Sequence, residues 1–502
     1  MKQTLFTSLT AVSCAVSIFG QERPNIVVFL VDDMGVMDTS VPFLVDQKGK
    51  PQRYPLNNWY NTPNMERLAQ QGVRFSTFYA QSVSSPTRAS IMTGQNATRH
   101  GTTNWINAES NNRTKYGPYN WNWTGLELSD QIYPAVLSEA GYTTIHVGKA
   151  HFGSNDSQGV SPENIGFDVN IAGSAIGQPG SYYGEHGYGW IKGNKSRAVP
   201  DLEEYHNTDT FLTDALTLEA GKEIAKAVKA GKPFYLNMAH YAVHAPFETD
   251  ERFINNYSEE KNDQARAFAT LIEGMDKSLG DLIQVLEELN VAENTFIIFL
   301  GDNGGDAPLG GAEEYGSSAP LRGKKGAKYE GGSRVPFIVS WAKPNPINVF
   351  QKAYPVAINH VQTQIGTIMD IYPTILSVAG VKLPANHTVD GADLKKLIQG
   401  KVDDKHRDDF LLHFPHEHRS SYFTTYRKGD WKLIYNYNPD QGGKPTYQLY
   451  NLAKDLYEEN DVAHQEREIL QKMCVLMMAQ LNREGALFPV DENDNTLYPQ
   501  MP

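Results

Sequence analysis

The chain has 502 residues, with 45 lysines and arginines against 58 aspartates and glutamates, and its formal net charge is −13. Hydrophobic residues make up 40% and charged residues 21%, which excludes a disordered chain and indicates a globular protein of one to three domains. The acidic balance argues against nucleic-acid binding, because affinity for phosphate requires clustered lysine and arginine. With only Cys14 and Cys474, a disulfide framework and a cysteine-rich zinc site are both excluded.

The first twenty residues have the layout of a secretory signal peptide. Lys2 supplies a positive charge, residues 5–19 are mostly apolar, and a polar stretch follows. The apolar run is too short for a stable membrane span. Cys14 lies in a poor context for lipidation, and the sequence does not decide whether it is lipidated. An N-terminal element of the fold is the disfavoured alternative, because the next strand begins cleanly at Asn25.

Buried strands alternate with helices through the first three quarters of the chain. Continuous apolar runs, typical of strands buried on both faces, lie at residues 25–31, 143–147, 233–238, 295–300 and 335–341. Helical periodicity fills the intervals at residues 62–71, 130–140, 212–230 and 265–289. This alternation predicts an α/β fold with a mostly parallel sheet sandwiched by helices.

The pattern changes after about residue 385. Short strands with turn residues between them are expected at 422–426, 431–435 and 447–451, followed by a helix at 465–483. We therefore predict a main α/β domain over residues 21–385 and a smaller C-terminal α+β subdomain over residues 386–502. The glycine- and tyrosine-rich residues 173–193 are expected to form a long loop, and loops of that length are often functional.

Polar side chains follow four of the predicted strands, at the sheet edge where open α/β folds bind ligands. A single aspartate after a strand usually caps the next helix, but four strands that all deliver such groups indicate a site. The carboxylate and amide members offer only oxygen ligands, which favours Ca²⁺ or Mg²⁺ over zinc. The side chains are Asp32 and Asp33 after the first strand, Lys149 and His151 after the second, His240 and His244 after the third, and Asp302 and Asn303 after the fourth.

Another candidate feature is the segment that begins at Ser84. Pro86 fits the first turn of a helix, so Ser84 is expected at a helix N-terminus, where amides and the helix dipole favour an anion. Taken alone, the segment favours the interpretation as an ordinary serine-capped helix.

These segments resemble the signatures of the type I sulfatases. Ser84-x-Pro86-x-Arg88 followed by Thr93-Gly94 resembles the signature whose first residue is Cys or Ser, and residues 141–151 match Gly-Tyr-x-Thr-x-x-x-Gly-Lys-x-His. The resemblance spans roughly residues 24–380 in the family's order. Its further motifs are Asp32-Asp33-Met34-Gly35, His244-Ala245-Pro246, Asp302-Asn303-Gly304, Leu321-Arg322-Gly323-Lys324-Lys325-Gly326, Tyr329-Glu330-Gly331-Gly332 and Met369-Asp370-Ile371-Tyr372-Pro373-Thr374.

The resemblance implies an alkaline-phosphatase-like fold, one divalent cation, and hydrolysis of sulfate esters by a residue 84 that a maturation enzyme oxidises to formylglycine (3-oxoalanine). An irregular, carboxylate-rich oxygen shell favours Ca²⁺ over Mg²⁺. The family usually has glycine where Lys324 stands, so the sulfate contact is carried to Lys325, with Lys324 as the alternative. The implied catalytic residues are Ser84, Arg88, Lys149, His151, His244 and Lys325. The implied metal ligands are Asp32, Asp33, Asp302, Asn303 and the oxygen of residue 84.

Serine at position 84 resembles the bacterial members of the family, so we expect a periplasmic or secreted bacterial enzyme acting on sulfated carbohydrate. A galactose or N-acetylgalactosamine sulfate is the predicted substrate class. The alternatives are a phosphatase or phosphodiesterase of the same fold, which normally binds two zinc ions, and a non-catalytic glycan-binding relative. Candidate substrate-binding residues are His100, Asn104 and Trp105 after the Ser84 helix, and His413, His416, His418 and Arg419 at the start of the C-terminal subdomain.

Overall fold

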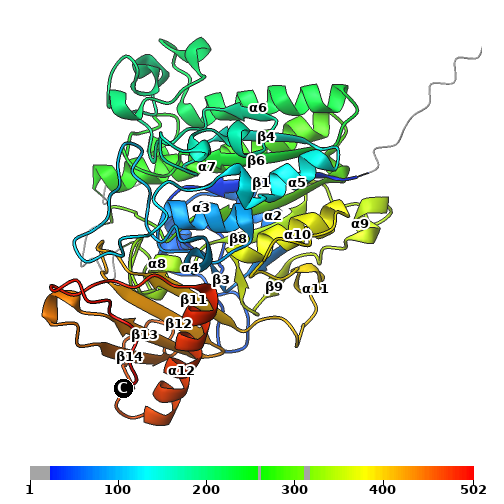
Figure 1. Ribbon diagram of the computed structural model, residues 1–502. Helices are drawn as coiled ribbons and strands as arrows, with labels where there is room; N and C mark the ends of the chain where they lie inside the picture. The colour runs from blue at the N-terminus through cyan, green and yellow to red at the C-terminus, as the bar shows by residue number, and fades with distance from the viewer. Residues whose placement is uncertain (1–22, 258–261, 310–316) are drawn as a thin grey trace, which may run out of the picture.

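The computed structural model describes residues 23–257, 262–309 and 317–502 (Figure 1). The predicted signal peptide and Cys14 lie outside these residues. An eight-stranded sheet crosses the main domain. From edge to edge it contains β5 (Val169–Ile171), β4 (Thr143–Gly148), β6 (Phe234–His240), β1 (Asn25–Val31), β7 (Thr295–Gly301), β8 (Phe337–Trp341), β2 (Val73–Phe75) and β9 (His360–Gln362).

The strands from β5 to β7 are parallel, whereas β8 is antiparallel to both β7 and β2. The register aligns the carboxyl ends of the central strands, because Val31 of β1 lies opposite His240 of β6 and Gly301 of β7. The residues that follow these strands therefore emerge together at one edge of the sheet. The predicted α/β fold with a mostly parallel sheet is confirmed.

Two helical layers cover the sheet (Figure 1). Because side chains alternate along a strand, β1 sends Phe29 to the layer on one face and Val28 to the layer on the other. The first layer contains α2 (Pro63–Gln71), α6 (Leu212–Lys229) and α7 (Asp263–Glu288), and the second contains α3 (Ser84–Thr93), α5 (Tyr133–Glu139) and α10 (Ile371–Ala379). Within the described residues, no helix is long and apolar enough to cross a membrane.

Most boundaries lie within two residues of the predicted ones, and the largest difference is at the start of one helix. The helix expected from residue 130 begins at Tyr133, because a separate 3-10 turn over Leu128–Asp130 precedes it and Gln131 adopts the left-handed conformation with φ 50°. The strand expected from residue 335 begins at Phe337.

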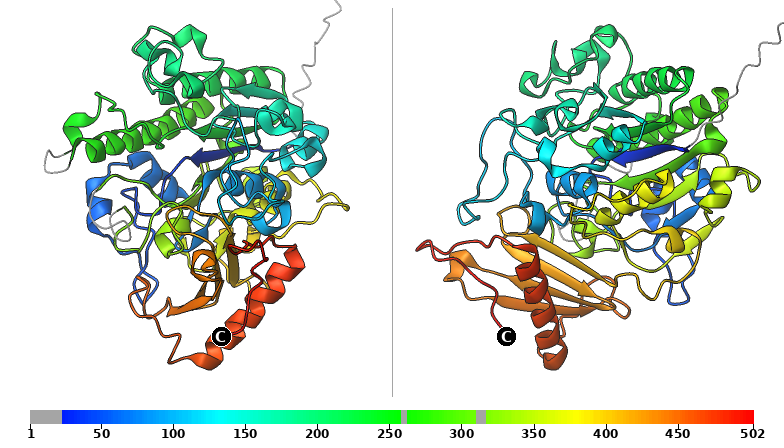
Figure 2. Two further views of the ribbon diagram at one scale, coloured as in Figure 1. Left: turned by 60° about the vertical axis from the view of Figure 1, so that its left-hand side comes forward. Right: turned by 45° about the vertical axis from the view of Figure 1, so that its right-hand side comes forward.

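The C-terminal subdomain is an antiparallel sheet with one helix packed on it, as Figure 2 shows in orange and red. Its core joins Leu433 and Tyr435 of the sheet to Met473, Cys474 and Met477 of the helix. Cys474 is a free thiol buried in this core. The elements are β11 (Asp409–Phe414), β12 (Phe423–Lys428), β13 (Trp431–Asn436), β14 (Thr446–Asn451) and α12 (Arg467–Glu484).

A buried ionic cluster joins this subdomain to the main domain. Lys432 of β13 lies 3.0 Å from Oε1 of Glu330, in the helical turn α8 (Glu330–Ser333), and 2.7 Å from Oε1 of Glu458. All three side chains are almost completely buried. Although burial opposes the charge, the two carboxylates raise the pKa of Lys432 to about 12. Lys432 thus balances the charge of two buried carboxylates.

Replacing Lys432 by methionine is expected to lower the free energy of unfolding by about 3–5 kcal/mol, because Glu330 and Glu458 lose a buried counter-ion. Lys428→Met on the neighbouring strand is the matched control. Its partly exposed ion pair with Asp408 predicts a loss below about 1 kcal/mol. Urea unfolding of the full chain measures both changes. Equal losses for the two variants would contradict the compensating role of Lys432.

Candidate active site

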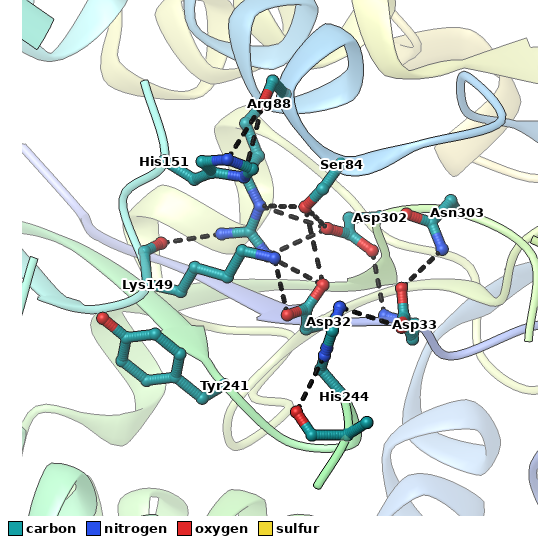
Figure 3. Close-up of polar contacts among 12 residues, drawn as sticks. Asp32, Asp33, Ser84, Arg88, Lys149, His151, Tyr241, His244, Asp302 and Asn303 are labelled. Atoms are coloured by element: carbon teal, nitrogen blue, oxygen red, sulfur yellow. Dashed lines mark hydrogen bonds and ion pairs between the residues drawn. The ribbon is translucent and has the colours of Figure 1, made fainter. Parts of the chain in front are cut away.

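Three carboxylates meet at the carboxyl edge of the sheet (Figure 3). Asp32 and Asp33 follow β1, and Asp302 follows β7. All three are buried, and one oxygen of each lies within 4.8 Å of the others. Asp33 adopts the left-handed conformation with φ 58°, which aspartate tolerates better than most residues. The turn after β1 thereby directs two successive carboxylates into one site.

Buried cations compensate these carboxylates. Lys149 Nζ lies 2.7 Å from Asp32 Oδ2, and Lys325 Nζ lies 2.8 Å from Asp33 Oδ2. Burial opposes ionisation of Asp33, but Lys325 beside it holds the pKa of this carboxyl well below its usual value. Burial dominates at Asp32 and raises the pKa of that carboxyl despite Lys149. The site therefore holds its carboxylates in unequal electrostatic environments.

Ser84 is the first residue of α3, and its hydroxyl lies at the centre of the site (Figure 3). The Oγ atom donates a hydrogen bond of 2.5 Å to Asp302 Oδ2 and accepts one of 3.0 Å from Arg88 Nε, one helical turn later. Arg88 also donates to Asp302 Oδ2 and to the carbonyl of Lys149. The spacing of one helical turn thus places the Arg88 guanidinium beside position 84. Its hydrogen bonds to Asp302 and to the carbonyl of Lys149 hold it there.

Two histidines line the same cavity as Ser84. His151, in the left-handed conformation with φ 52°, donates from Nε2 to the carbonyl of Ile106 at 2.8 Å. His244 donates from Nδ1 to the carbonyl of Ala245, which leaves Nε2 to accept from Lys325 Nζ at 3.0 Å. Burial and the charge of Lys325 lower the pKa of His244 to about 3. In the protein without substrate, the His244 imidazole is therefore neutral at physiological pH.

His240, the other histidine after β6, lies outside the site. Its ring packs against Phe29 in the core, and its Nε2 is 2.9 Å from Ser278 Oγ. Burial lowers the pKa of His240 to about 3. Its surroundings are those of a core histidine.

A cavity of about 400 Å³ opens onto the site. Ser84, Lys149, His151, His244 and Lys325 line its inner part, so the structure brings five of the six predicted catalytic residues to one surface, with Arg88 directly behind. Its outer part is lined by Trp105, Glu109, Gln178, Ser196, Arg197 and His418, among others.

The structure places some of the predicted substrate-binding residues on the cavity wall and others away from it. Trp105 and His418 line the cavity. His100 instead lies 3.0 Å from Ser90 Oγ, behind the Ser84 helix, and the buried Asn104 accepts a hydrogen bond from the amide of Trp105. Neither of these two side chains reaches the cavity.

The structure also keeps three residues of the C-terminal subdomain from the cavity. His413 is buried in β11 between Thr424 and the carbonyl of Leu487, and the buried His416 lies 2.8 Å from Thr103 Oγ1. We therefore correct the expectation that these two bind substrate: the run of histidines belongs to a strand and the turn after it, so these rings pack into the protein.

Arg419 also has a different role from the expected one, because it pairs with Asp306 at 2.7 Å and donates to the carbonyl of Lys325. It contacts the loop that carries Lys325 rather than the cavity. Lys324 extends toward the same Asp306, at 4.0 Å, whereas Lys325 points into the site, so the geometry favours Lys325 for the sulfate contact.

Sequence reasoning missed Glu109, Gln178 and Arg197 on the cavity wall. The one available signal for Gln178 was the long glycine-rich stretch at residues 173–193. Gly177 in this stretch lies against the His151 ring, because an added Cβ would be 3.0 Å from its Cε1 atom. The segment therefore packs directly on the His151 ring.

Comparison with known proteins defines the class. The Sulfatase family model matches residues 24–381, and the model for the C-terminal region of N-sulphoglucosamine sulphohydrolase matches residues 324–484. The chain is 31% identical over 403 residues to N-acetylgalactosamine-6-sulfatase of Mus musculus, covering 76% of this chain and 68% of that protein. It is 29% identical over 505 residues to a sulfatase of Formosa agariphila, covering 88% and 84%.

A solved structure, that of Ps i-CgsB, superimposes with a TM-score of 0.72 at 25% identity, covering 93% of this chain and 95% of that one. The same protein was also solved in complex with k-i-k-neocarrahexaose. The chain therefore belongs to the sulfatase family. Its class of activity is the hydrolysis of sulfuric esters, which confirms the predicted enzyme class.

The family generally uses a divalent cation, and the residues at the carboxylate cluster fit one. Asn303 Oδ1 is buried and has no hydrogen-bond donor among the described residues, whereas its Nδ2 donates to Asp33 Oδ1 at 2.9 Å. An uncompensated buried carbonyl oxygen costs free energy unless a ligand satisfies it. Together with three carboxylates it supplies an all-oxygen donor set, which suits a hard cation.

Asn303→Leu is expected to raise the dissociation constant for Ca²⁺ by about 10–100-fold, because it removes one neutral oxygen ligand. Calorimetric titration of the chelator-treated protein with Ca²⁺ measures the change. Asp38→Asn is the control: burial raises the pKa of Asp38 to about 8, so this nearby acid carries little charge at pH 7 and lies outside the carboxylate cluster. An unchanged dissociation constant in Asn303→Leu would exclude Asn303 as a ligand.

Proposed function

We propose that the protein removes sulfate from saccharides with a formylglycine formed from Ser84, and that one Ca²⁺ assists. The observation that carries this proposal is the position of Ser84 Oγ, 2.5 Å from Asp302 Oδ2 and 3.0 Å from Arg88 Nε, in a cavity lined by two lysines and three histidines. An ordinary serine hydroxyl is too weak a nucleophile for a sulfate ester at neutral pH. Oxidation of Ser84 would supply the missing reactivity: the hydrated aldehyde offers one hydroxyl to attack sulfur and a second whose deprotonation expels sulfate.

The residues around position 84 have two kinds of proposed role: some act on residue 84 and others on the sulfate group. Arg88, fixed between Asp302 and the carbonyl of Lys149, orients the oxygens of residue 84. His151 donates from Nε2 to a carbonyl, and its Nδ1 lies 3.3 Å from the hydroxyl of Ser85, the residue after position 84. We propose that Nδ1 receives a proton from residue 84. Lys149 and Lys325 point into the cavity, where they stabilise charge on the sulfate oxygens.

His244 is proposed as the general acid for the leaving oxygen. Its Nε2 faces Lys325, 3.0 Å away, and lies within the cavity where the sulfate ester must bind. The charge of Lys325 lowers the pKa of His244 in the free protein, and an anionic sulfate bound at Lys325 opposes that effect. The proton thus becomes available when substrate is bound.

Calcium is the proposed cation. The four donors are irregularly disposed oxygens, three of them carboxylates, and Ca²⁺ accepts such shells more readily than Mg²⁺, which requires a tighter octahedron. Bound at this edge, the cation would polarise an oxygen of residue 84 and one of sulfate. A phosphatase of this fold normally uses two zinc ions, but among the described residues only one group of three candidate acidic or histidine ligands is found.

The proposed substrate is a galactose- or N-acetylgalactosamine-type sulfate. Its support is the similarity to N-acetylgalactosamine-6-sulfatase and to a protein solved with k-i-k-neocarrahexaose, together with Trp105 on the cavity wall. An aromatic face at that position suits stacking on a sugar ring. A non-catalytic glycan-binding role is disfavoured, because each predicted catalytic side chain is present and oriented toward the site. We further propose a periplasmic or secreted bacterial enzyme that a maturation enzyme activates.

The first test is the modification. Protein expressed with a maturation enzyme is expected to show, by mass spectrometry of the peptide spanning position 84, the loss of two hydrogens that converts serine to formylglycine. The Ser84→Ala variant is the control and should show neither the mass change nor turnover. Fully active protein whose Ser84 peptide carries no modification would contradict the mechanism.

The function is tested by sulfate release from a sugar sulfate and from an aryl sulfate. Wild-type protein should release sulfate from both. His244→Ala is expected to slow the sugar sulfate by about 10²–10⁴-fold and the aryl sulfate much less, because a phenolate leaves without a proton. His151→Ala should slow both substrates alike, since it acts on the side of residue 84.

His240→Ala is the matched control, because this histidine follows the same strand but lies in the core. Equal losses on both substrates in His244→Ala, or leaving-group dependence only in His240→Ala, would overturn the assignment of the general acid. Absence of sulfate release from every sugar sulfate, with retained aryl sulfate turnover, would contradict the proposed carbohydrate substrate.

A further inference from the structure

The segment between β5 and α6 is a packed lobe rather than a loose loop, and it forms one wall of the active-site cavity. The amide of Asn194 donates to the carbonyl of Gly180 at 3.1 Å, and the indole of Trp190 donates to the carbonyl of Val199 at 2.8 Å. Tyr188 and Val199 are completely buried. These contacts fix the lobe, which lies at the upper left in Figure 1, against the main domain.

Arg197 is held at a defined place in this lobe. It ends the 3-10 turn η5 (Lys195–Arg197), which is capped by Asn194, and its amide donates to the carbonyl of Asn194 at 3.0 Å. The next residues, Ala198 and Val199, are buried. The backbone on both sides is therefore anchored, and the half-buried side chain of Arg197 lines the same cavity as the catalytic residues.

Arg197 differs from the other two permanent cations of the cavity wall. Lys149 and Lys325 are each paired with an aspartate of the carboxylate cluster. Within the part of the chain that the structure describes, the Arg197 guanidinium forms no hydrogen bond or ion pair. It thus offers its full set of donors to the cavity.

Among the described residues that line the cavity, Glu109 is the one acidic side chain, and it does not neutralise Arg197 by contact. No ion pair within 4.0 Å joins the two among the described residues. A carboxylate accepts hydrogen bonds from sugar hydroxyls, whereas a guanidinium is the fork that binds a carboxylate or sulfate with two parallel hydrogen bonds. The outer cavity therefore combines a site for hydroxyls with a site for an anion.

We propose that Arg197 binds a second anionic group of the substrate, a carboxylate or a second sulfate, so that the preferred substrate is a saccharide with at least two acidic groups. This inference rests on the proposed hydrolysis of saccharide sulfates and deepens it. The two possible sources of the anion, a sulfate on the same ring and a uronic acid on the neighbouring ring, share the same chemistry at Arg197.

The experiment compares three probes with the mature full-length enzyme: N-acetylgalactosamine 6-sulfate, N-acetylgalactosamine 4,6-disulfate, and a disaccharide of the 6-sulfated sugar linked to a uronic acid. The measured quantity is kcat/KM for release of the 6-sulfate. Arg197→Ala is expected to lower it by about 10–100-fold on at least one doubly acidic probe, and by less than about threefold on the monosulfate. The probe that shows the loss identifies the source of the anion.

Two further variants separate recognition from folding. Arg197→Lys keeps the charge but not the fork, and should recover part of the loss. Lys195→Ala removes an exposed cation from the same turn that does not line the cavity, and should leave all three values unchanged. A loss in Lys195→Ala equal to that in Arg197→Ala would show a general effect of charge and overturn the proposal.

Equal losses on all three probes in Arg197→Ala, or no loss on any, would also overturn the proposal, since either result shows that Arg197 does not read a second anion. Wild-type enzyme that releases sulfate from none of the probes would instead contradict the proposed substrate class, and this inference with it. The two failures are therefore distinguishable.

Discussion

The balance of buried charge at the carboxyl edge of the sheet is the constraint on which the site depends. Three carboxylates lie together without access to water, an arrangement that would be strongly destabilising by itself. Three cationic side chains, Arg88, Lys149 and Lys325, each contact one of them. The same cations face the cavity or position 84, so the groups that compensate the carboxylates are those proposed to orient residue 84, in the case of Arg88, and to bind sulfate, in the case of the two lysines. Stability and chemistry share one set of interactions.

The sheet provides the precision that this balance requires. Asp32 and Asp302 come from neighbouring parallel strands whose register fixes their backbones, and their amides are hydrogen-bonded across the sheet. Lys149 is tied in the same way, by its amide, to the carbonyl of Ala239 in β6. Groups carried on rigid elements hold their separations, which is the condition for preorganised electrostatic stabilisation.

The cavity walls, which would determine substrate specificity, come from other parts of the chain than the strand ends. The walls of the cavity come from the segment after α3, the packed lobe before α6, and the turn that opens the C-terminal subdomain. Arg419 in that turn pairs with Asp306 and contacts the carbonyl of Lys325, so the subdomain supports the loop of a proposed sulfate-binding lysine. Loops thus form the walls of the cavity, whereas residues at the ends of strands form its base, so the proposed substrate contacts and the carboxylate cluster lie on separate parts of the chain.

The amino-acid sequence by itself determined the α/β class, five strands of the central sheet, and the polar groups that follow four of them, because buried strands and their polar ends are local patterns. It also indicated Ser84 and Arg88, one helical turn apart on the same helix. Only the tertiary structure decided which residues reach the outer part of the cavity. His413 and His416, which were expected to bind substrate, instead pack inward with β11 and the turn after it, and Arg419 pairs with Asp306, 113 residues away in the chain. Arg197 reaches the cavity because its lobe folds back onto His151, and contacts between segments so distant in sequence leave no local periodicity from which they can be inferred.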